Sequence, residues 1–469
     1  MRPGIRQGMY LTVASAAVLA LLSSTALADT LRMALTQAYQ NNPLLNAQRA
    51  AVRVTDEGVP QALSGYRPRI SLSASVAEQY LDSLTKSTTT TGAYTSTSGA
   101  NAVQSYGGTV TQTLLNGFQT ASRTRQAEQL VSASRETLRL TEQTVLLAAA
   151  TAYMNLIRDD AILQLQRSNV EVLQEQLRQV RDRFNVGEIT RTDVAQAESR
   201  LAAGRSTMLT AESNLTTSRA TYRQVIGVEP GKLAPASPVD RLSPQALPQG
   251  IAQARARHPS VTTAMFNVDA AGFQVKIAES SLYPTLNLVG SAQKNYGSAS
   301  SLSTLESFSG SVAGQLTIPV FQGGAEYATI RQAKETLQQR RVDLDTARDQ
   351  AQQTLVQSWG QLEAAKAQIE ATQAQVAAAE IALNGVREEA RVGQRTTLDV
   401  LNAQQELVNA RVALVTAQRD RVVASYALLA AAGRLSAQVL QLDVPIYDPA
   451  VHYHQVRDTW VGVRTPEGK

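Results

Sequence analysis

Four segments of the chain alternate apolar and polar residues with a period of two. In the first, Ile70, Leu72 and Ala74 fall on one face and the intervening serines fall on the other. A period of two is typical of β-strands with one apolar face. All four segments keep the same phase, so they are predicted to be strands at about 66–81, 103–115, 283–296 and 308–321.

Long stretches after each strand pair follow a different period, that of a coiled coil. Apolar or small residues recur at alternating steps of three and four in an outgoing stretch, at Val170, Leu173, Leu177, Val180 and Phe184. A returning stretch does the same, at Val194, Ala197, Leu201, Gly204, Met208, Ala211 and Leu215. This spacing predicts left-handed packing between two antiparallel helices. Since residues 117–186 contain no proline, the outgoing helix is predicted to run for about 105 Å.

The second half of the chain repeats the first. Positions in the long stretches match at a constant offset of 206 residues, as in Gly117 with Gly323 and Asp193 with Asp399. A constant offset indicates that neither copy has an insertion there, as expected of long helices. Near the strands the copies differ by ten residues, which we place in a longer surface loop within the Ser/Thr-rich tract Thr85–Ala100.

The repeat and the proline-rich segment between its two copies predict the domain organisation. The segments are a leader at 1–28, a first repeat at 29–227 with its hairpin at 117–227, a proline-rich linker at 228–250, a second repeat at 251–433 with its hairpin at 323–433, and a C-terminal segment at 434–469. The fold class is therefore mainly α with a β part, made of a duplicated strand pair and two long helical hairpins.

At each hairpin tip the sequence predicts the end of one helix and the start of the next. Gly187 and Gly393 suit the left-handed position that ends many helices. Thr190 with Asp193 forms a capping box for the first returning helix, and Thr396 with Asp399 forms one for the second. Capping is thus the simplest role of these aspartates, and it leaves room for a second one.

The N-terminus has the form of a secretory signal peptide. Arg2 and Arg6 precede an apolar run at 9–22, and Ala26-Leu27-Ala28 forms a cleavage site, so the mature chain is predicted to begin at Asp29. Removing two arginines takes the net charge from +5 to +3, which gives no reason to expect nucleic acid as a partner. The chain has no cysteine, which excludes a disulfide framework, a thiolate metal site and a lipidated N-terminal cysteine.

The remaining sequence has no apolar stretch long enough for a transmembrane helix. The alternating strands alone fit a soluble sandwich as well as an outer-membrane barrel. The signal peptide and the strand length favour the barrel, in which Tyr80 and Tyr296 would lie in an aromatic girdle at the membrane interface, close to Glu78 and Lys294. Four strands cannot close a barrel in lipid. Three copies would give twelve strands with room for a lumen, so the chain is predicted to form a trimer.

Enzymatic chemistry has no candidate residues in this sequence. It contains neither a phosphate-binding loop nor a nucleophile elbow. His258 matches Asn42 in the repeat, and both precede a proline, so His258 is predicted to be a helix N-cap. His452 and His454 are predicted to be a solvated tail rather than a metal site. We therefore expect no catalytic residue, no cofactor and no metal.

The duplicated strand and helix plan, together with the tip sequence V-G-Q-R-T-T-L-D-V-L-N-A at 392–403, resembles the TolC family of outer-membrane efflux and secretion channels. The resemblance covers nearly the whole mature chain. It implies a trimer with a twelve-stranded barrel in outer-membrane lipid, a periplasmic α-barrel closed at its tip, and an equatorial belt that includes 228–250 and the segment after Leu440.

The resemblance also implies roles for residues at the tips. Arg395 would be a latch, Asp193 a partner for such a latch, and Asp399 a member of an acidic ring. Two positions depart from the family pattern, because Asn402 stands where a second acidic ring is expected and Ala390 where a latch tyrosine is expected. The gate is therefore predicted to be less acidic and more loosely latched.

The tip turns, at Val186, Gly187, Val392 and Gly393, would dock a periplasmic adaptor that joins the duct to an inner-membrane transporter, either an RND pump or an ABC exporter. The cargo, drugs or secreted protein, stays open. The alternative function is a trimeric periplasmic coiled coil or adhesin stalk without a channel. The four strands with polar faces argue against a stalk.

Overall fold

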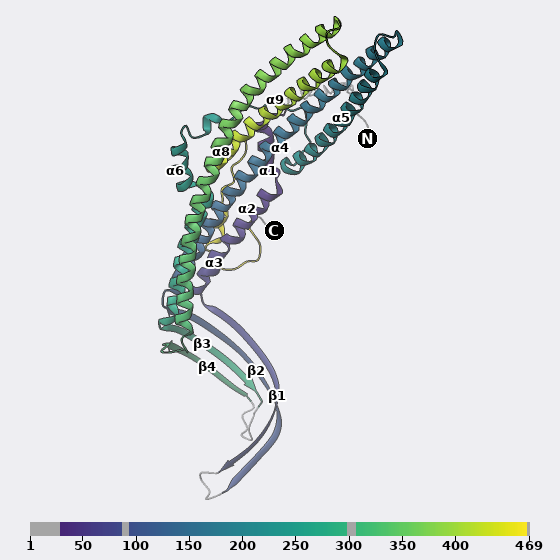
Figure 1. The fold of residues 1–469 in the computed structure, drawn as a ribbon. Helices are drawn as coiled ribbons and strands as arrows, with labels where there is room; N and C mark the ends of the chain where they lie inside the picture. Colours follow the sequence, from purple (N-terminus) through teal and green to yellow (C-terminus); the bar gives the residue numbers. More distant parts are fainter. Residues whose placement is uncertain (1–28, 87–92, 298–305, 467–469) are drawn as a thin grey trace, which may run out of the picture.

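The computed structural model describes residues 29–86, 93–297 and 306–466, so the signal peptide predicted at 1–28 lies outside the described residues. The molecule is elongated, with a curved sheet at one end, two long helical hairpins towards the other, and shorter helices packed beside the hairpins (Figure 1). This architecture confirms the predicted fold class. Among the described residues, no helix combines the length and the hydrophobicity that crossing a bilayer requires.

Two hairpins of unequal arms make up most of the length. Their outgoing helices are α4 (Gln119–Asn185) and α8 (Ala325–Arg391), with 67 residues each. Their returning helices are α5 (Arg191–Ile226) and α9 (Thr397–Ala431). A helix of 67 residues is about 100 Å long, as the proline-free stretch predicted.

The predicted coiled-coil seam is buried in the first hairpin. Val170, Leu173 and Leu177 of α4 pack with Ala197 and Leu201 of α5 in one apolar cluster. Phe184, which follows the same spacing, is 41% exposed because it lies in the last turn before the tip. Gly204 allows the helices to approach closely, since a Cβ there would lie 2.8 Å from Leu173 Cδ1.

Shorter helices pack beside the long hairpin helices. They are α1 (Leu31–Asn41), α2 (Pro43–Asp56), α3 (Gly58–Leu63), α6 (Leu247–Arg257), α7 (Pro259–Glu279) and α10 (Ala450–Val456), with three single 3₁₀ turns at Ser64–Tyr66, Asp240–Leu242 and Ser280–Leu282. The largest apolar cluster forms here, around the fully buried Tyr153 and Tyr222. Asn42 caps α2, and His258 caps α7 by accepting the Ser260 N–H at 3.3 Å, which confirms the predicted N-cap.

The C-terminal histidines differ from the predicted solvated tail. Helix α10 packs on α2, so His452 is buried and its Nδ1 lies 3.1 Å from Oδ2 of the fully buried Asp56. His454 is exposed. The prediction was wrong for His452 because a pair of histidines carries no local signal for a partner almost 400 residues away. Burial also raises the pKa of Asp56.

The four strands form one antiparallel sheet in the order β1-β2-β3-β4. The strands are β1 (Arg69–Lys86), β2 (Tyr94–Asn116), β3 (Thr285–Tyr296) and β4 (Glu306–Thr317). Ile70 pairs with Val110, Val110 with Gly290, and Gly290 with Val312. Since directly paired residues share a face, the apolar faces of all four strands lie on one side of the sheet, as their common phase predicted.

The first two strands are longer than predicted. The Ser/Thr-rich tract assigned to a loop is mostly strand, with Thr85 paired to Thr95 and Tyr80 to Ala100. A polar composition suggested a loop, but β-branched threonines also favour extended backbone when a partner strand is present. Strand β4 ends at Thr317 instead of 321, because Pro319 has no N–H for the ladder.

Gly204→Leu should destabilise the first hairpin by about 1–3 kcal/mol, because the new side chain overfills the seam against Leu173. Gly385→Leu in α8 is the matched control. A Cβ at Gly385 meets no atom within 4 Å, so this change should stabilise by up to about 1 kcal/mol through helix propensity. Thermal unfolding followed by circular dichroism would measure both, and equal midpoints for the two variants would contradict the close approach.

Candidate functional site: the hairpin tips and the apolar face of the sheet

The two hairpins end in turns of the same geometry. Gly187 and Gly393 both have φ of 81°, which confirms the predicted left-handed positions. The N–H of Glu188 donates to the Arg183 carbonyl at 3.0 Å, and the N–H of Gln394 donates to the Glu389 carbonyl at 2.9 Å. These bonds satisfy carbonyls that the helix ends would leave free.

Each returning helix begins with the predicted capping box. Oδ2 of Asp193 accepts hydrogen bonds from the Thr190 N–H at 3.0 Å and from Thr190 Oγ1 at 2.7 Å. Oδ2 of Asp399 accepts from the Thr396 N–H at 3.0 Å and from Thr396 Oγ1 at 2.9 Å. The Thr190 hydroxyl and N–H lower the pKa of Asp193, and the Thr396 N–H and hydroxyl lower the pKa of Asp399. Both carboxylates are therefore charged at neutral pH.

The predicted latch residues are not brought together within one chain. Arg395 Nε donates to Glu389 Oε2 of its own hairpin at 2.8 Å, whereas Asp193 is held in its capping box. A corresponding pair at the other tip joins Arg183 to Glu188 at 2.7 Å. Such exposed ion pairs contribute little stability, so they can exchange partners easily.

One side-chain bond near the tips joins the two hairpins. Arg200 Nη2 on α5 donates to Asn402 Oδ1 on α9 at 2.6 Å. Next to it, Leu401 is buried in the apolar cluster of the first hairpin. Sequence reasoning singled out Asn402 but missed Arg200, because the two positions are 202 residues apart and Arg200 belongs to no motif.

The turns themselves present apolar side chains to solvent. Val186 is 78% exposed and Val392 is 70% exposed. A Cβ added at Gly187 or Gly393 would meet no atom within 4 Å. Both turns are therefore open surfaces in the structure of one chain. Ala390, at the position expected for a latch tyrosine, is half-buried.

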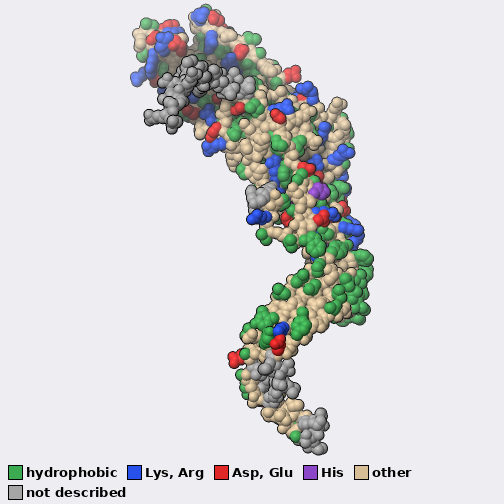
Figure 2. Space-filling model, turned by 180° about the vertical axis from the view of Figure 1, so that it is seen from behind, with side chains coloured by type: hydrophobic (Ala, Val, Ile, Leu, Met, Phe, Trp, Pro, Cys, Tyr) green, Lys and Arg blue, Asp and Glu red, His purple; other side chains and the backbone are tan. Residues whose placement is uncertain are grey.

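The other candidate surface is the apolar face of the sheet. Apolar side chains cover much of the sheet in the view of Figure 2, whereas charged side chains gather over the helices. Leu72, Val312 and Phe308 are each more than 70% exposed. Soluble monomers rarely expose a contiguous apolar patch of this kind, which therefore marks a contact with lipid or protein.

The two tyrosines predicted for the girdle lie at different levels of the sheet. Tyr296 pairs with Gln104, which pairs with Val76, so Tyr80 lies four residues further along β1. Tyr296 meets the ring of Tyr106 edge to face at 6.1 Å, an aromatic neighbour that sequence reasoning did not assign to the girdle. Lys294 forms an ion pair with Glu306 across β3 and β4 at 2.5 Å.

The outer strands leave the backbone of the sheet incomplete. In the described part of the chain, β1 pairs only with β2, and β4 pairs only with β3. Each outer strand therefore has one edge of N–H and C=O groups without a strand partner. The same described residues contain no group of three or more His, Cys, Asp or Glu side chains that could hold a metal ion.

Comparison with known proteins gives consistent matches to this geometry. The family model described as outer membrane efflux protein matches residues 34–228 and 250–434. The outer membrane efflux protein BepC of Brucella suis is 42% identical over 449 residues, covering 96% of this chain and 95% of BepC. The outer membrane protein TolC of Escherichia coli is 27% identical, covering 89% of this chain and 85% of TolC.

A solved structure agrees in fold. The outer membrane channel CmeC of Campylobacter jejuni superposes with a TM-score of 0.72 at 16% identity, covering 91% of this chain and 89% of CmeC. At this level of identity the similarity supports the fold alone.

The capping boxes should make the tips sensitive to acid. Because the folded-state pKa values of Asp193 and Asp399 lie below the ordinary value of 3.8, their stabilising effect is present above that pH and is lost as the pH falls through the folded values. Hydrogen exchange by mass spectrometry, corrected for intrinsic rates, should show faster opening of tip peptides at pH 3 than at pH 5. An Asp193→Asn, Asp399→Asn variant should lose part of this pH dependence and keep the part that comes from Glu188 and Glu389 in their ion pairs. A variant whose tip peptides respond to pH as strongly as those of the unsubstituted protein would contradict the assignment.

Proposed function

Since the chain belongs to the outer membrane efflux protein family, we propose that three copies assemble into one exit duct for a tripartite efflux or type I secretion system. The chain is an outer-membrane channel protein with its helices in the periplasm, and it is a passive conduit rather than an enzyme. The observation that carries the trimer is a sheet whose apolar face is exposed and whose two edges lack a strand partner in the described chain.

Closure of the sheet sets the number of copies. In lipid every backbone polar group needs a protein partner, so an open four-stranded sheet is not stable there. Edge strand β4 of one copy would pair with β1 of the next until the barrel closes. Two copies would give about eight strands, a barrel filled by its own side chains, whereas three give about twelve and leave a lumen.

The polar face of the sheet suits a water-filled lumen. Ser71, Ser73 and Ser75 of β1 lie opposite the apolar row, and Ser291 of β3 bonds to Ser311 of β4 at 2.9 Å on the same face. A stalk without a channel has no use for a sheet with one polar and one apolar face. The sheet therefore favours the duct over the rival stalk.

The tips would form the gate of the duct. In a closed trimer, Arg395 would exchange Glu389 for Asp193 of a neighbouring copy, and Asp399 would contribute to an acidic ring. Arg200 and Asn402 bond to each other at 2.6 Å, so the second ring position would carry a neutral amide beside a cation. The entrance is therefore less acidic than two aspartate rings would make it.

The exposed tip turns would receive the other components of the system. Val186 with Gly187, and Val392 with Gly393, form two open apolar turns of the same shape on each chain. A periplasmic adaptor that binds these turns and an inner-membrane RND pump or ABC exporter would complete the assembly. Docking would open the gate by separating the hairpin tips.

The shared barrel is tested by isolating outer membranes and running the protein unheated on a denaturing gel. A band near the mass of three mature subunits is expected, together with stepwise conductance of the purified species in planar bilayers. Recovery only as a monomer from the soluble periplasm would contradict the duct, because it would leave the sheet edges unpaired.

The latch is tested by Arg395→Ala. Because an exposed ion pair is weak, its loss should shift the closed-to-open ratio by no more than about fivefold per latch. Single-channel recording would measure the open fraction, with Arg391→Ala as the control, since Arg391 pairs with Glu388 on the same helix at 3.3 Å. An Arg395→Ala channel that opens no more often than the control would refute the latch.

A further inference from the structure

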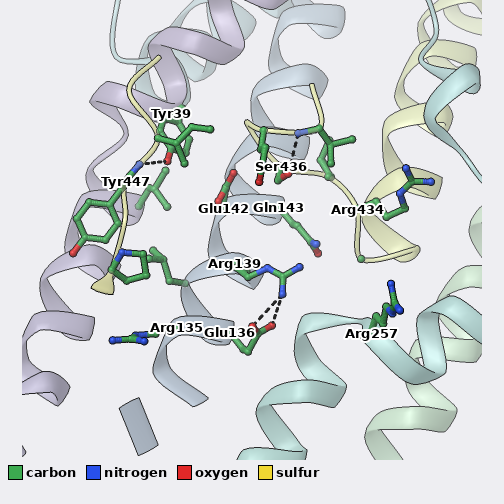
Figure 3. Close-up of a pocket in the computed structure, with 18 of the residues that line it drawn as sticks. Tyr39, Arg135, Glu136, Arg139, Glu142, Gln143, Arg257, Arg434, Ser436 and Tyr447 are labelled. Atoms are coloured by element: carbon green, nitrogen blue, oxygen red, sulfur yellow. Dashed lines mark hydrogen bonds and ion pairs between the residues drawn. The ribbon is translucent and has the colours of Figure 1, made fainter. Parts of the chain in front are cut away.

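A cleft of about 830 Å³ lies beside the middle of α4, between the sheet and the hairpin tips. Its walls come from α1, α2, α4, α6 and the segment that follows α9 (Figure 3). Pockets of about 300–1,000 Å³ are typical of small-molecule sites. The cleft belongs neither to the gate nor to the apolar face of the sheet, so the proposed duct does not use it.

The cleft has an excess of positive charge. Its lining contains no lysine or aspartate, two glutamates, Glu136 and Glu142, and five arginines, Arg49, Arg135, Arg139, Arg257 and Arg434. Glu136 is already paired with Arg139 at 2.8 Å and accepts from Thr262 Oγ1 at 2.8 Å. Glu142 accepts the N–H of Ala437 at 2.7 Å, and burial raises the pKa of Glu142. Arg135 also interacts with the nearby acid Asp56, and Arg49 donates to Asn46 Oδ1 and to the Tyr39 carbonyl, so among the described residues the guanidinium groups of the lining left without a partner are those of Arg257 and Arg434.

Two buried groups in the lining lack hydrogen-bond partners within the described chain. Nε and Nη2 of Arg135 are donors without an acceptor, and Oε1 of Gln253 is an acceptor without a donor. Buried polar atoms are almost always paired in native proteins. A ligand that satisfies Gln253 Oε1 must offer a hydroxyl or amide donor.

Two further arginines of the lining, Arg257 and Arg434, come from backbone segments that pack closely against each other. A Cβ on Gly433 would lie 3.0 Å from His258 Cα and 3.4 Å from the Arg257 carbonyl, so only glycine permits this approach. Arg257 is the last residue of α6, and Arg434 directly follows Gly433. The two arginines therefore lie on neighbouring segments of the chain. Neither side chain has a hydrogen bond or ion pair in the part of the chain that the structure describes.

An aromatic wall closes the opposite side of the cleft. In Figure 3, Tyr447 and Tyr39 lie across the cleft from Arg257 and Arg434. Tyr39 Oη accepts the N–H of Tyr447 at 3.1 Å, and the Arg49 guanidinium lies 4.5 Å from the centre of the Tyr39 ring. These contacts fix the tyrosines, and an aromatic face is a good surface for the apolar side of a ligand ring.

We propose that this cleft binds an anionic saccharide, made of sugar units that carry carboxylate or phosphate groups. Arg257 and Arg434 hold the acid groups, since guanidinium binds carboxylate and phosphate in bidentate fashion. A sugar hydroxyl donates to Gln253 Oε1, and one face of a sugar ring packs on Tyr447. The site does not depend on conduction through the duct.

Isothermal titration calorimetry of the purified full-length mature protein in a non-ionic detergent tests the site. Trigalacturonate should bind, with an affinity that falls as salt is raised, whereas neutral maltotriose should not. Arg257→Gln and Arg434→Gln should each weaken binding about tenfold or more, the usual effect of losing a charge-assisted hydrogen bond. Glucose 1,6-bisphosphate tests phosphate as the acid group, and its tighter binding at the same residues would support the site with phosphate as the preferred anion.

Arg255→Gln is the matched control, because Arg255 lies on the same helix but bonds to Gln352 at 2.6 Å outside the cleft. It should leave binding unchanged, and all variants should keep the helical circular dichroism spectrum. The proposal is overturned if both anionic saccharides bind no better than maltotriose, if Arg257→Gln and Arg434→Gln bind like the control, or if inorganic phosphate binds as tightly. Bilayer conductance is measured on the same preparations, so failure of this site and failure of the duct remain distinct results.

Discussion

The need to pair every backbone N–H and C=O group in lipid is the constraint on which the rest of this structure depends. One chain provides four strands with a continuous apolar face, and in its described residues the outer edges of β1 and β4 have no strand partner. The sheet is therefore complete only when copies are placed edge to edge. The duplication within the chain reduces the number of copies that closure requires.

The same closure organises the helices, because each strand pair leads directly into a hairpin. At the first junction Gly117 and Phe118 have φ of 59° and 61°, and at the second Gly323 and Gly324 have φ of 72° and 84°. These left-handed positions turn the chain into the long helix, directly after β2 at the first junction and after the short segment 318–322 at the second. In the proposed trimer, closing the sheet in lipid would therefore also arrange the helices in a ring. The β-barrel in the membrane would continue directly into a ring of helices in the periplasm.

The stability of the structure is concentrated away from the tips. The large apolar cluster around Tyr153 and Tyr222 lies beside the middle of α4, whereas the tips are held by exposed ion pairs and capping bonds. Each tip contact contributes little. A region with few buried apolar contacts opens at low cost in free energy, as the gate proposed for the tips requires.

The sequence by itself determined everything that depends on local spacing. Strand phase, the heptad seams, the left-handed glycines and the N-caps at Asn42 and His258 follow from residues a few positions apart, whose geometry is set by the strand or helix period. The repeat follows from comparing the two halves of the chain at a constant offset. Pairing between distant segments was decided only by the tertiary structure. Pairing of Thr85 with Thr95 makes strand of a tract whose composition suggested a loop. His452 is buried against Asp56, and Arg200 of the first hairpin bonds to Asn402 of the second. These contacts depend on which surfaces of the folded chain pack together. The contacts of a side chain with residues far away in the sequence do not produce a periodic sequence pattern, so they could not be predicted from spacing.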